Sequence, residues 1–276
     1  MAFTKNPRSN LTKATLKLMQ RLILLLVTLL GLTVLNVAGG QARPATATSD
    51  HAVIQRRRLV LVRPPDVAKR FPQKKQAVVN YPVVSGLDPV VLRRVRALFD
   101  FKNIFDYSLK EYREDAWLSE FDYVVNYNAH HLLDISFSQS GSGAYPDEHT
   151  KHFLIDLRSG KLLKAADVFV AKKMPELIAK VDLKLRAELK GILEELRASH
   201  SDAEDLKMAS EAQEPLSYAQ ENLDEFSVGN KGITFLYDAG YPHAIQAFAP
   251  NGRYFFNYAE LKPFIKPDGP LGHFIQ

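Results

Sequence analysis

The sequence predicts an α+β fold, in which an antiparallel sheet packs against one long helix and shorter helices. Three observations lead to this fold class. Segments with strand-like alternation and short hairpin turns occupy residues 120–157 and again residues 225–258. One long amphipathic helix pattern covers residues 173–199 between them. The order of strands, long helix and strands again is typical of an α+β domain.

The first strand is expected in "AVVNYPVV", residues 77–84, which is rich in β-branched residues. Pro82 has no backbone N–H, so it indicates an edge strand or a bulge. A helix should follow, because Asp88 can cap its N-terminus and Pro89 suits its first position. The apolar stripe of this helix consists of Val91, Leu92, Val95, Leu98 and Phe99.

Residues 120–140 read as two strands joined near Asn128. Alternation would place His131 in the second strand, on one face with Leu133, Ile135 and Phe137. A flexible loop, "GSGAYP", and the strand "HFLIDL" come next, and residues 161–169 run into a short helix. These segments predict consecutive antiparallel strands.

The long helix has an apolar stripe at steps of three and four residues, made of Ile178, Val181, Leu185, Leu189, Ile192 and Leu196. The polar segment from residue 199 to 215 is expected to be a loop with a poorly ordered helix. The chain then returns to strands in "EFSV", "ITFLYD" and "GRYFFNY", and "YAELKPFI" closes it with a helical turn or two.

The N-terminus has the three parts of a secretory signal peptide, predicted for residues 1–42. Five basic and no acidic residues lie in the first 21 positions, and the apolar run of residues 22–38 follows. Small residues then precede the expected cleavage between Ala42 and Arg43. The alternative is an uncleaved segment that anchors the chain by a single transmembrane helix. Membrane contact is expected only through this segment, if it stays uncleaved.

Cleavage at this point would remove the whole excess of positive charge. The chain has 36 basic and 31 acidic residues, and residues 1–42 hold five basic residues and no acidic one, so 31 of each remain. The high isoelectric point therefore does not indicate a nucleic-acid partner. Residues 43–75 are predicted to be a basic linker with a short extended segment. The chain has no cysteine, which excludes disulfides and thiol chemistry.

Asp147-Glu148-His149-x-x-His152 is the first candidate for chemistry. Along a strand, His149 and His152 point to opposite faces, so they cannot share a metal. The neighbouring pair His130-His131 is read as strand in the same way, with structural histidines. We therefore expect no metal site, no cofactor and no catalytic residue in these stretches, which favours a binding protein over an enzyme.

Two tyrosines are candidates for ligand contact. Tyr145 and Tyr241 lie in predicted loops that contain glycine, and each is followed directly by proline. Proline restricts a loop, so less entropy is lost on binding, and tyrosine offers a large apolar face with a hydroxyl. Together with His243, they form the predicted ligand-binding set. The alternative is that the tyrosines only close the ends of the core.

Residues 135–169, "ISFSQSGSGAYPDEHTKHFLIDLRSGKLLKAADVF", resemble the extracytoplasmic lysozyme-binding domain of RsiV-type anti-sigma factors. They also resemble the non-catalytic N-terminal region of PdaC-type peptidoglycan deacetylases. The features that match are Gly143-Ala144-Tyr145-Pro146, Thr150, Asp156, Gly160-Lys161 and Asp167-x-Phe169. Residues 226–265 resemble the closing section of that domain, and residues 76–115 resemble its smaller partner region. Ser159, where threonine is usual, and "DAGYPH" depart from the pattern.

The resemblance implies one extracytoplasmic domain over residues 76–276, with a smaller partner region (76–115) and a main part (116–276). It implies a stand-alone exported module of the bacterial cell envelope, periplasmic or extracellular. Its expected ligand is a lysozyme-like protein or a peptidoglycan glycan. The alternatives are an enzyme that acts on cell-wall polymer and a membrane-anchored structural or adaptor protein.

Overall fold

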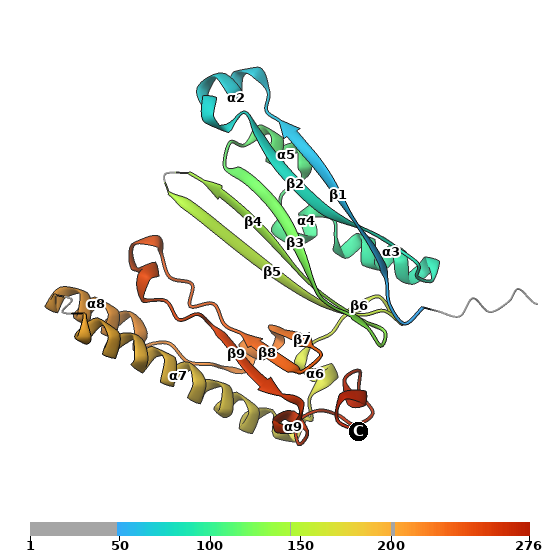
Figure 1. Cartoon of the computed structure of the whole chain (residues 1–276), viewed down its shortest axis with the longest axis vertical. Coiled ribbons are helices and arrows are strands. Elements are labelled where there is room, and N and C mark those ends of the chain that lie inside the picture. The colour runs from blue at the N-terminus through green and yellow to red at the C-terminus, as the bar shows by residue number, and fades with distance from the viewer. Residues whose placement is uncertain (1–48, 144, 200–201) are drawn as a thin grey trace, which may run out of the picture. The chain divides into compact units, whose positions relative to one another are not determined.

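Two β-sheets organise the chain in the computed structural model, which describes residues 49–143, 145–199 and 202–276 (Figure 1). Residues 48–276 form one compact unit, and this unit alone is described below. The expected signal segment, its apolar run and the Ala42–Arg43 cleavage point lie outside the described residues. Mixed α and β structure with mostly antiparallel strands confirms the predicted α+β class.

The larger sheet has six strands in sequence order. Its strands are β1 (Val53–Val62), β2 (Gln76–Ser85), β3 (Leu118–Ala129), β4 (Leu132–Ser142), β5 (Pro146–Asp156) and β6 (Lys161–Leu162). All neighbours are antiparallel except β2 and β3, which run parallel and pair only at Val78–Glu120 and Val79–Phe121. Beyond Val79 the two strands part, so Pro82 lies where β2 pairs with β1 alone. A missing N–H is tolerated at such a local edge, as the sequence predicted.

Short helices cover one face of this sheet and form the first core. They are α3 (Pro89–Leu98), α4 (Phe101–Phe105) and α5 (Leu109–Glu114). Asp88 caps α3 as predicted, because its carboxylate accepts hydrogen bonds from the backbone N–H groups of Val90 and Val91. The core is contributed by Val91, Val95, Ile104 and Tyr112 from the helices and by Phe121, Ile135, Phe137 and Phe153 from the sheet.

The second sheet is three-stranded and packs against the long helix α7 (Met174–Ala198). Its strands are β7 (Phe226–Gly229), β8 (Gly232–Leu236) and β9 (Arg253–Asn257), all antiparallel. The buried face of α7 is formed by Leu177, Val181, Leu185 and Leu189, which confirms the middle of the predicted stripe. Ile178, Ile192 and Leu196 of that stripe are only half-buried. The single sheet expected from the sequence is therefore two sheets, each with its own helix layer.

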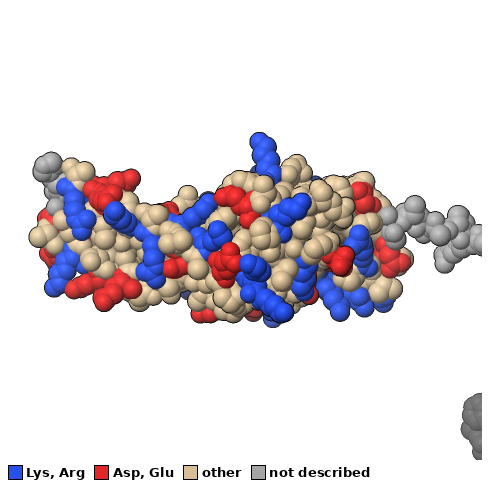
Figure 2. All heavy atoms as spheres, turned by 90° about the horizontal axis from the view of Figure 1, so that it is seen from below, with Lys and Arg blue, Asp and Glu red and all other residues tan. Residues whose placement is uncertain are grey.

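The remaining elements are short. They are α2 (Pro65–Arg70), η1 (Pro72–Lys74), α6 (Ala165–Val168), η2 (Ala171–Lys173), α8 (Ala203–Gln213), η3 (Gln220–Asp224), η4 (His243–Phe248), α9 (Tyr258–Leu261) and η5 (Gly272–Phe274). Helix α8 fills most of the segment that was expected to be a loop with a poorly ordered helix; Asp202 caps its N-terminus and Ala209 is buried. Ion pairs spaced four residues apart line α7 and α8, and the face seen in Figure 2 accordingly mixes both signs of charge.

Strand β1 is longer than the short extended segment that was expected within the basic linker of residues 43–75. It pairs with β2 over all ten of its residues, and Ala52 and Leu61 are buried in the first core. The next residue, Arg63, is 3% exposed and donates from Nη2 to the Leu118 carbonyl oxygen at 2.5 Å. Burial lowers the pKa of Arg63, and nearby Asp115 opposes this shift. The folded unit thus begins well before residue 76.

Among the described residues, none of the helices has the length and apolar character that a membrane crossing requires.

We predict that a chain starting at Gln76 is much less stable than one starting at Ser49. Leu61 alone should contribute about 1.5–3 kcal/mol by burial, and β2 also loses its partner strand. A loss of about 3 kcal/mol corresponds to a melting temperature lower by about 6–12 °C in a unit of this size. Circular dichroism melting curves of both chains measure the difference, and equal melting temperatures would contradict the assignment of β1 to the fold.

Candidate functional site

Two of the three predicted contact residues come together. Tyr145 precedes β5, and His243 begins η4, which follows β8 in the chain. Their rings stack with centroids 4.7 Å apart and planes 21° apart. Tyr145 is 62% exposed and His243 is also exposed, so one ring face of Tyr145 is covered and much of the remaining ring is open to solvent.

Tyr241 takes a different position, although it is two residues from His243. Its hydroxyl donates to the Ala212 carbonyl oxygen of α8 at 2.8 Å, and its ring packs against the second core. Burial raises the pKa of the Tyr241 phenol. A half-buried tyrosine ring with a hydrogen-bonded hydroxyl has a structural role. This geometry fits the alternative given above, in which Tyr241 only closes the end of the core.

A row of hydroxyls leads away from Tyr145 along β4. Ser136, Ser138 and Ser140 share one face of the strand, opposite the face that carries Ile135 and Phe137. Their partners on β5 are His152, Thr150 and Glu148, in that order. We call Ser136, Ser138, Ser140 and Thr150 the serine row. The three serines are half-buried, Thr150 is exposed, and the larger side chains of Glu120 and Glu148 flank the row at its outer end.

At the inner end of the row, Asp134 forms a buried polar network. Its side chain is fully buried, and its carboxylate accepts hydrogen bonds from Asn126 Nδ2 at 2.7 Å and from the Val228 N–H at 2.5 Å. Ser227 Oγ lies 3.3 Å from the same carboxylate. Val228 and Ser227 belong to β7, so one carboxylate of the large sheet holds an edge strand of the small sheet. Buried carboxylates persist when donors satisfy them in this way.

His152 and Ser136 extend this network into a Ser–His–Asp arrangement. Ser136 Oγ lies 3.1 Å from His152 Nδ1, and His152 Nε2 lies 3.3 Å from Asp134 Oδ2. The second contact has ion-pair distance but is not aligned as a hydrogen bond. Ser136 also lies in the middle of a strand that pairs on both sides, so its own N–H is used in the sheet and does not face a substrate oxyanion. The arrangement therefore fits a structural junction better than a nucleophile.

The two histidines of the motif Asp147-Glu148-His149-x-x-His152 point to opposite faces of the sheet, as the alternation along a strand predicted. His152 points to the face of Asp134, whereas His149 stacks near Trp117 with ring centroids 5.8 Å apart and meets Asp147 at 3.1 Å. Close approach of the strands shapes this end of the sheet, because a Cβ on Gly141 would lie 2.2 Å from the Trp117 carbonyl oxygen. Within the described residues, no group of three His, Asp or Glu side chains is arranged to hold a metal ion.

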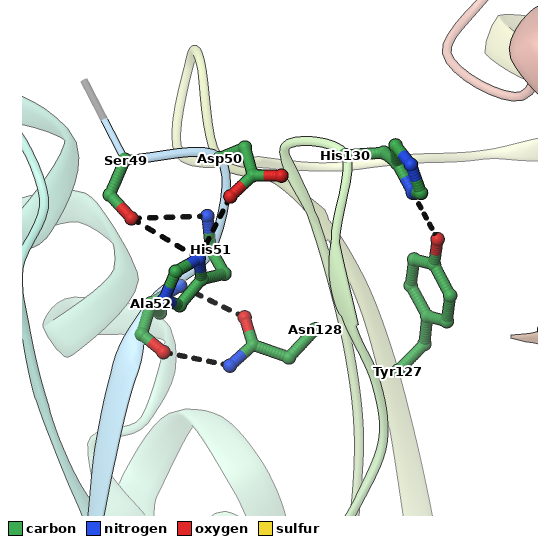
Figure 3. Close-up of polar contacts among 7 residues, drawn as sticks. All are labelled: Ser49, Asp50, His51, Ala52, Tyr127, Asn128 and His130. Carbon is green, nitrogen blue, oxygen red and sulfur yellow. Dashed lines mark hydrogen bonds and ion pairs between the residues drawn. The ribbon is translucent and has the colours of Figure 1, made fainter. Parts of the chain in front are cut away.

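His130 and His131 are not in a strand, which corrects the sequence interpretation. They form the two-residue turn between β3 and β4, with φ angles of 53° and 61°. Such turns favour asparagine and glycine, so two histidines here are unusual and strained. The Tyr127 hydroxyl contacts His130 Nδ1 at 2.5 Å, and Asn128 binds both backbone groups of Ala52 (Figure 3).

The C-terminal segment docks beside this turn. The rings of His130 and His273 have centroids 4.5 Å apart, and Phe274 stacks on Tyr258 at 4.2 Å. Nε2 of His273 is buried without a hydrogen-bond partner. Burial lowers the pKa of His273, and His130 and Arg158 lower it further, whereas the Pro270 backbone opposes the shift. The approach of His273 to His130 was not recognisable from sequence, because His273 lies 142 residues beyond the turn.

Comparison with known proteins identifies the fold. No family model matches the sequence, and no curated protein matches it either. A solved member of the DUF3298 family from Bacteroides fragilis is 15% identical, with a TM-score of 0.52 over 83% of this chain and 99% of that chain. A DUF3298 family protein from Pseudomonas aeruginosa is 16% identical, with a TM-score of 0.48 over 78% and 94%. The chain thus shares its fold with a family whose domain has no known function, and the link to RsiV- and PdaC-type proteins stays a prediction.

We predict that Asp134→Asn lowers the free energy of unfolding by about 2–4 kcal/mol, because the amide faces donors that need a carboxylate. Ser138→Ala is the matched control on the same strand face, and it should change stability by less than about 0.5 kcal/mol. Denaturant unfolding measures both values. An equal, small effect of the two substitutions would show that the Asp134 network is not a junction.

We predict that stability falls on acidification through His273. Its folded-state pKa lies below the ordinary 6.5, so the unfolded chain binds the proton more readily and stability is lost as the pH falls below that value. Melting curves from about pH 7 to about pH 5 should show this loss, and His273→Leu should reduce it. The groups that face His273 are His130 and Arg158, with Tyr127 behind His130. An identical pH dependence in His273→Leu would assign the effect to another residue.

Proposed function

We propose that this protein is an exported binding module of the cell envelope and that it holds a cell-wall glycan on the serine row and the Tyr145–His243 pair. The observation that carries the proposal is the exposed ring stack at the end of a row of hydroxyls. The serine row lies between the contact of Asp134 with β7 and the stack of Tyr145, in the loop before β5, on His243 of η4.

The aromatic pair suits the apolar face of a sugar ring. Tyr145 is a large exposed ring whose orientation is fixed on one side by His243. Fixing a ring before binding lowers the entropy that binding costs. The phenol hydroxyl remains available for a hydrogen bond at the rim of the sugar. Pro146, which follows Tyr145, restricts the backbone at the same point.

The serine row suits the hydroxyl groups of a glycan. Hydroxyls act as both donors and acceptors, so they match sugar hydroxyls in either orientation. The side chains of Ser138 and Ser140 have no hydrogen-bond partner among the described residues, which leaves them free for a ligand. Their small size also lets a chain approach the sheet between the larger residues of β3 and β5.

The proposed compartment rests on the N-terminal sequence and on the resemblance. A basic head, an apolar run and small residues support export, and both families that the sequence resembles work at the bacterial cell surface. A lysozyme-like protein is the other ligand that the resemblance suggests. An open row of hydroxyls favours the glycan, because the centre of a protein interface is usually apolar and aromatic.

We predict that Tyr145→Ala weakens binding of soluble peptidoglycan fragments by about 1–3 kcal/mol, without changing the melting temperature. Isothermal titration calorimetry with these fragments, with chitin oligomers and with lysozyme separates the ligand classes. Tyr107→Ala is the matched control, since Tyr107 is also an exposed tyrosine but belongs to the helix side of the sheet.

Tyr241→Ala should behave in the opposite way. It removes a half-buried ring and its hydrogen bond, so it should lower stability by about 1–3 kcal/mol while binding per folded molecule is unchanged. Glycan binding that survives Tyr145→Ala and His243→Ala would refute the proposed surface. If the protein binds lysozyme and none of the glycans, the proposed glycan ligand is refuted. If the protein hydrolyses the fragments and Ser136→Ala abolishes this hydrolysis, the protein is an enzyme.

A further inference from the structure

The outer edge of β1 presents unpaired backbone groups. The Arg63 N–H donates to the Lys75 carbonyl oxygen, and this pair continues the register of β1 and β2. In an antiparallel pair, every second residue of a strand points its N–H and C=O groups at the partner strand. The odd-numbered residues of β1 therefore point their backbone groups at β2. Even-numbered residues then point outward. Two contacts agree with this assignment, since the Val62 carbonyl oxygen binds Arg113 Nε and both backbone groups of Ala52 bind the Asn128 side chain.

These two contacts close the ends of the edge and leave its middle open. Asn128 occupies the start of the edge, as Figure 3 shows, and Arg113 occupies its end at 3.1 Å from the Val62 oxygen. For the N–H and C=O groups of Arg58 and Val60, the described part of the chain offers no partner. The segment from Arg57 to Leu61 therefore has an open ladder at the margin of the sheet (Figure 1).

The side chains along this open ladder combine positive charge with exposed apolar surface. Arg56 is engaged, because it meets Asp122 at 2.5 Å, whereas Arg57 and Arg58 have no partner among the described residues. Leu59, Val60 and Val62 are 36%, 41% and 62% exposed. Charge alone can protect an edge from aggregation, but a merely protected edge does not need branched apolar residues on both faces.

We propose that β1 binds an extended, acidic segment of another protein, which pairs with the outward backbone groups of Arg58 and Val60 as an added strand. Acidic residues at neighbouring positions of the segment would meet Arg57 on one face and Arg58 on the other, since these two side chains alternate. Apolar side chains next to them would cover Leu59 and Val60. When a strand is added to a sheet edge in this way, backbone hydrogen bonds supply most of the affinity, and contacts of the alternating side chains supply the specificity.

Charge excludes two other occupants. A second copy of β1 would bring the arginines of both copies together along one seam, and like charges across a strand pair are destabilising. The preceding part of this chain is also unsuitable, because no Asp or Glu occurs before Asp50. The proposed segment is independent of the glycan surface, which uses other strands and other residues.

The test uses the full chain and a labelled peptide as long as β1, 10 residues, with the repeat Glu-Glu-Val-Val. Fluorescence anisotropy should show binding that weakens at high salt. Val60→Pro removes only an outward N–H, so the pairing with β2 remains, and peptide affinity should fall by about tenfold or more. Val60→Ala keeps the N–H and is the matched control. The double variant Arg57→Glu, Arg58→Glu should lower the affinity by a similar factor.

Two further peptides keep the test independent of how the variants fold. A lysine-for-glutamate peptide should not bind, and a peptide N-methylated at every residue should lose binding because neither of its edges can donate N–H groups to the ladder. The proposal is overturned if the acidic peptide does not bind, if Val60→Pro binds as Val60→Ala does, or if the N-methylated peptide binds equally well. A concentration-dependent dimer that Val60→Pro dissolves would assign the edge to a second copy instead.

Discussion

The buried carboxylate of Asp134 is the interaction on which the rest of the fold depends. It belongs to the central strand β4 of the large sheet, yet it binds the backbone of β7 in the small sheet. Apolar contacts alone are non-directional, so they do not fix how two sheets meet. A fully buried charge with several donors does, because any other arrangement leaves it unpaired. The apolar neighbours Leu132, Leu154 and Tyr127 then complete the second core around the same junction.

This junction divides one face of the large sheet into two parts. Near Asp134 the face is covered by the second core, and farther along β4 it carries the serine row, with its half-buried serines and exposed Thr150. The opposite face is mainly apolar where α3, α4 and α5 cover it, apart from the buried Gln139, whose side-chain oxygen accepts a hydrogen bond from the Tyr112 hydroxyl. Where this part of the sheet ends, Tyr145 in the loop before β5 stacks on His243 of η4. The proposed glycan surface is thus the portion of sheet that lies between two fixed contacts.

Local sequence patterns predicted most of the helices and strands. Contacts between residues far apart in the sequence could not be predicted. Asp88 with Pro89 marked α3, and the stripe around Val181 and Leu185 marked α7, because caps and periodicity act within a few residues. Strand β1 was expected only as a short extended segment in a linker, because the arginines at positions 56–58 are typical of a solvated segment and its full length depends on pairing with β2. Tyr145 and Tyr241 had the same local context, and their different roles come from His243 and Ala212, which lie far away in the sequence.

Hydrogen–deuterium exchange of the full chain, with and without soluble peptidoglycan fragments, tests the central claim most directly. The account predicts that fragments slow exchange in β4, in the first half of β5 and around His243, and leave α7 and the helices behind the large sheet unchanged. Bound ligand would slow exchange of the backbone N–H groups beneath the serine row and beside Tyr145, because it restrains the strand ends, where local unfolding is easiest. Protection confined to other elements, or no protection at fragment concentrations that saturate binding, would contradict it.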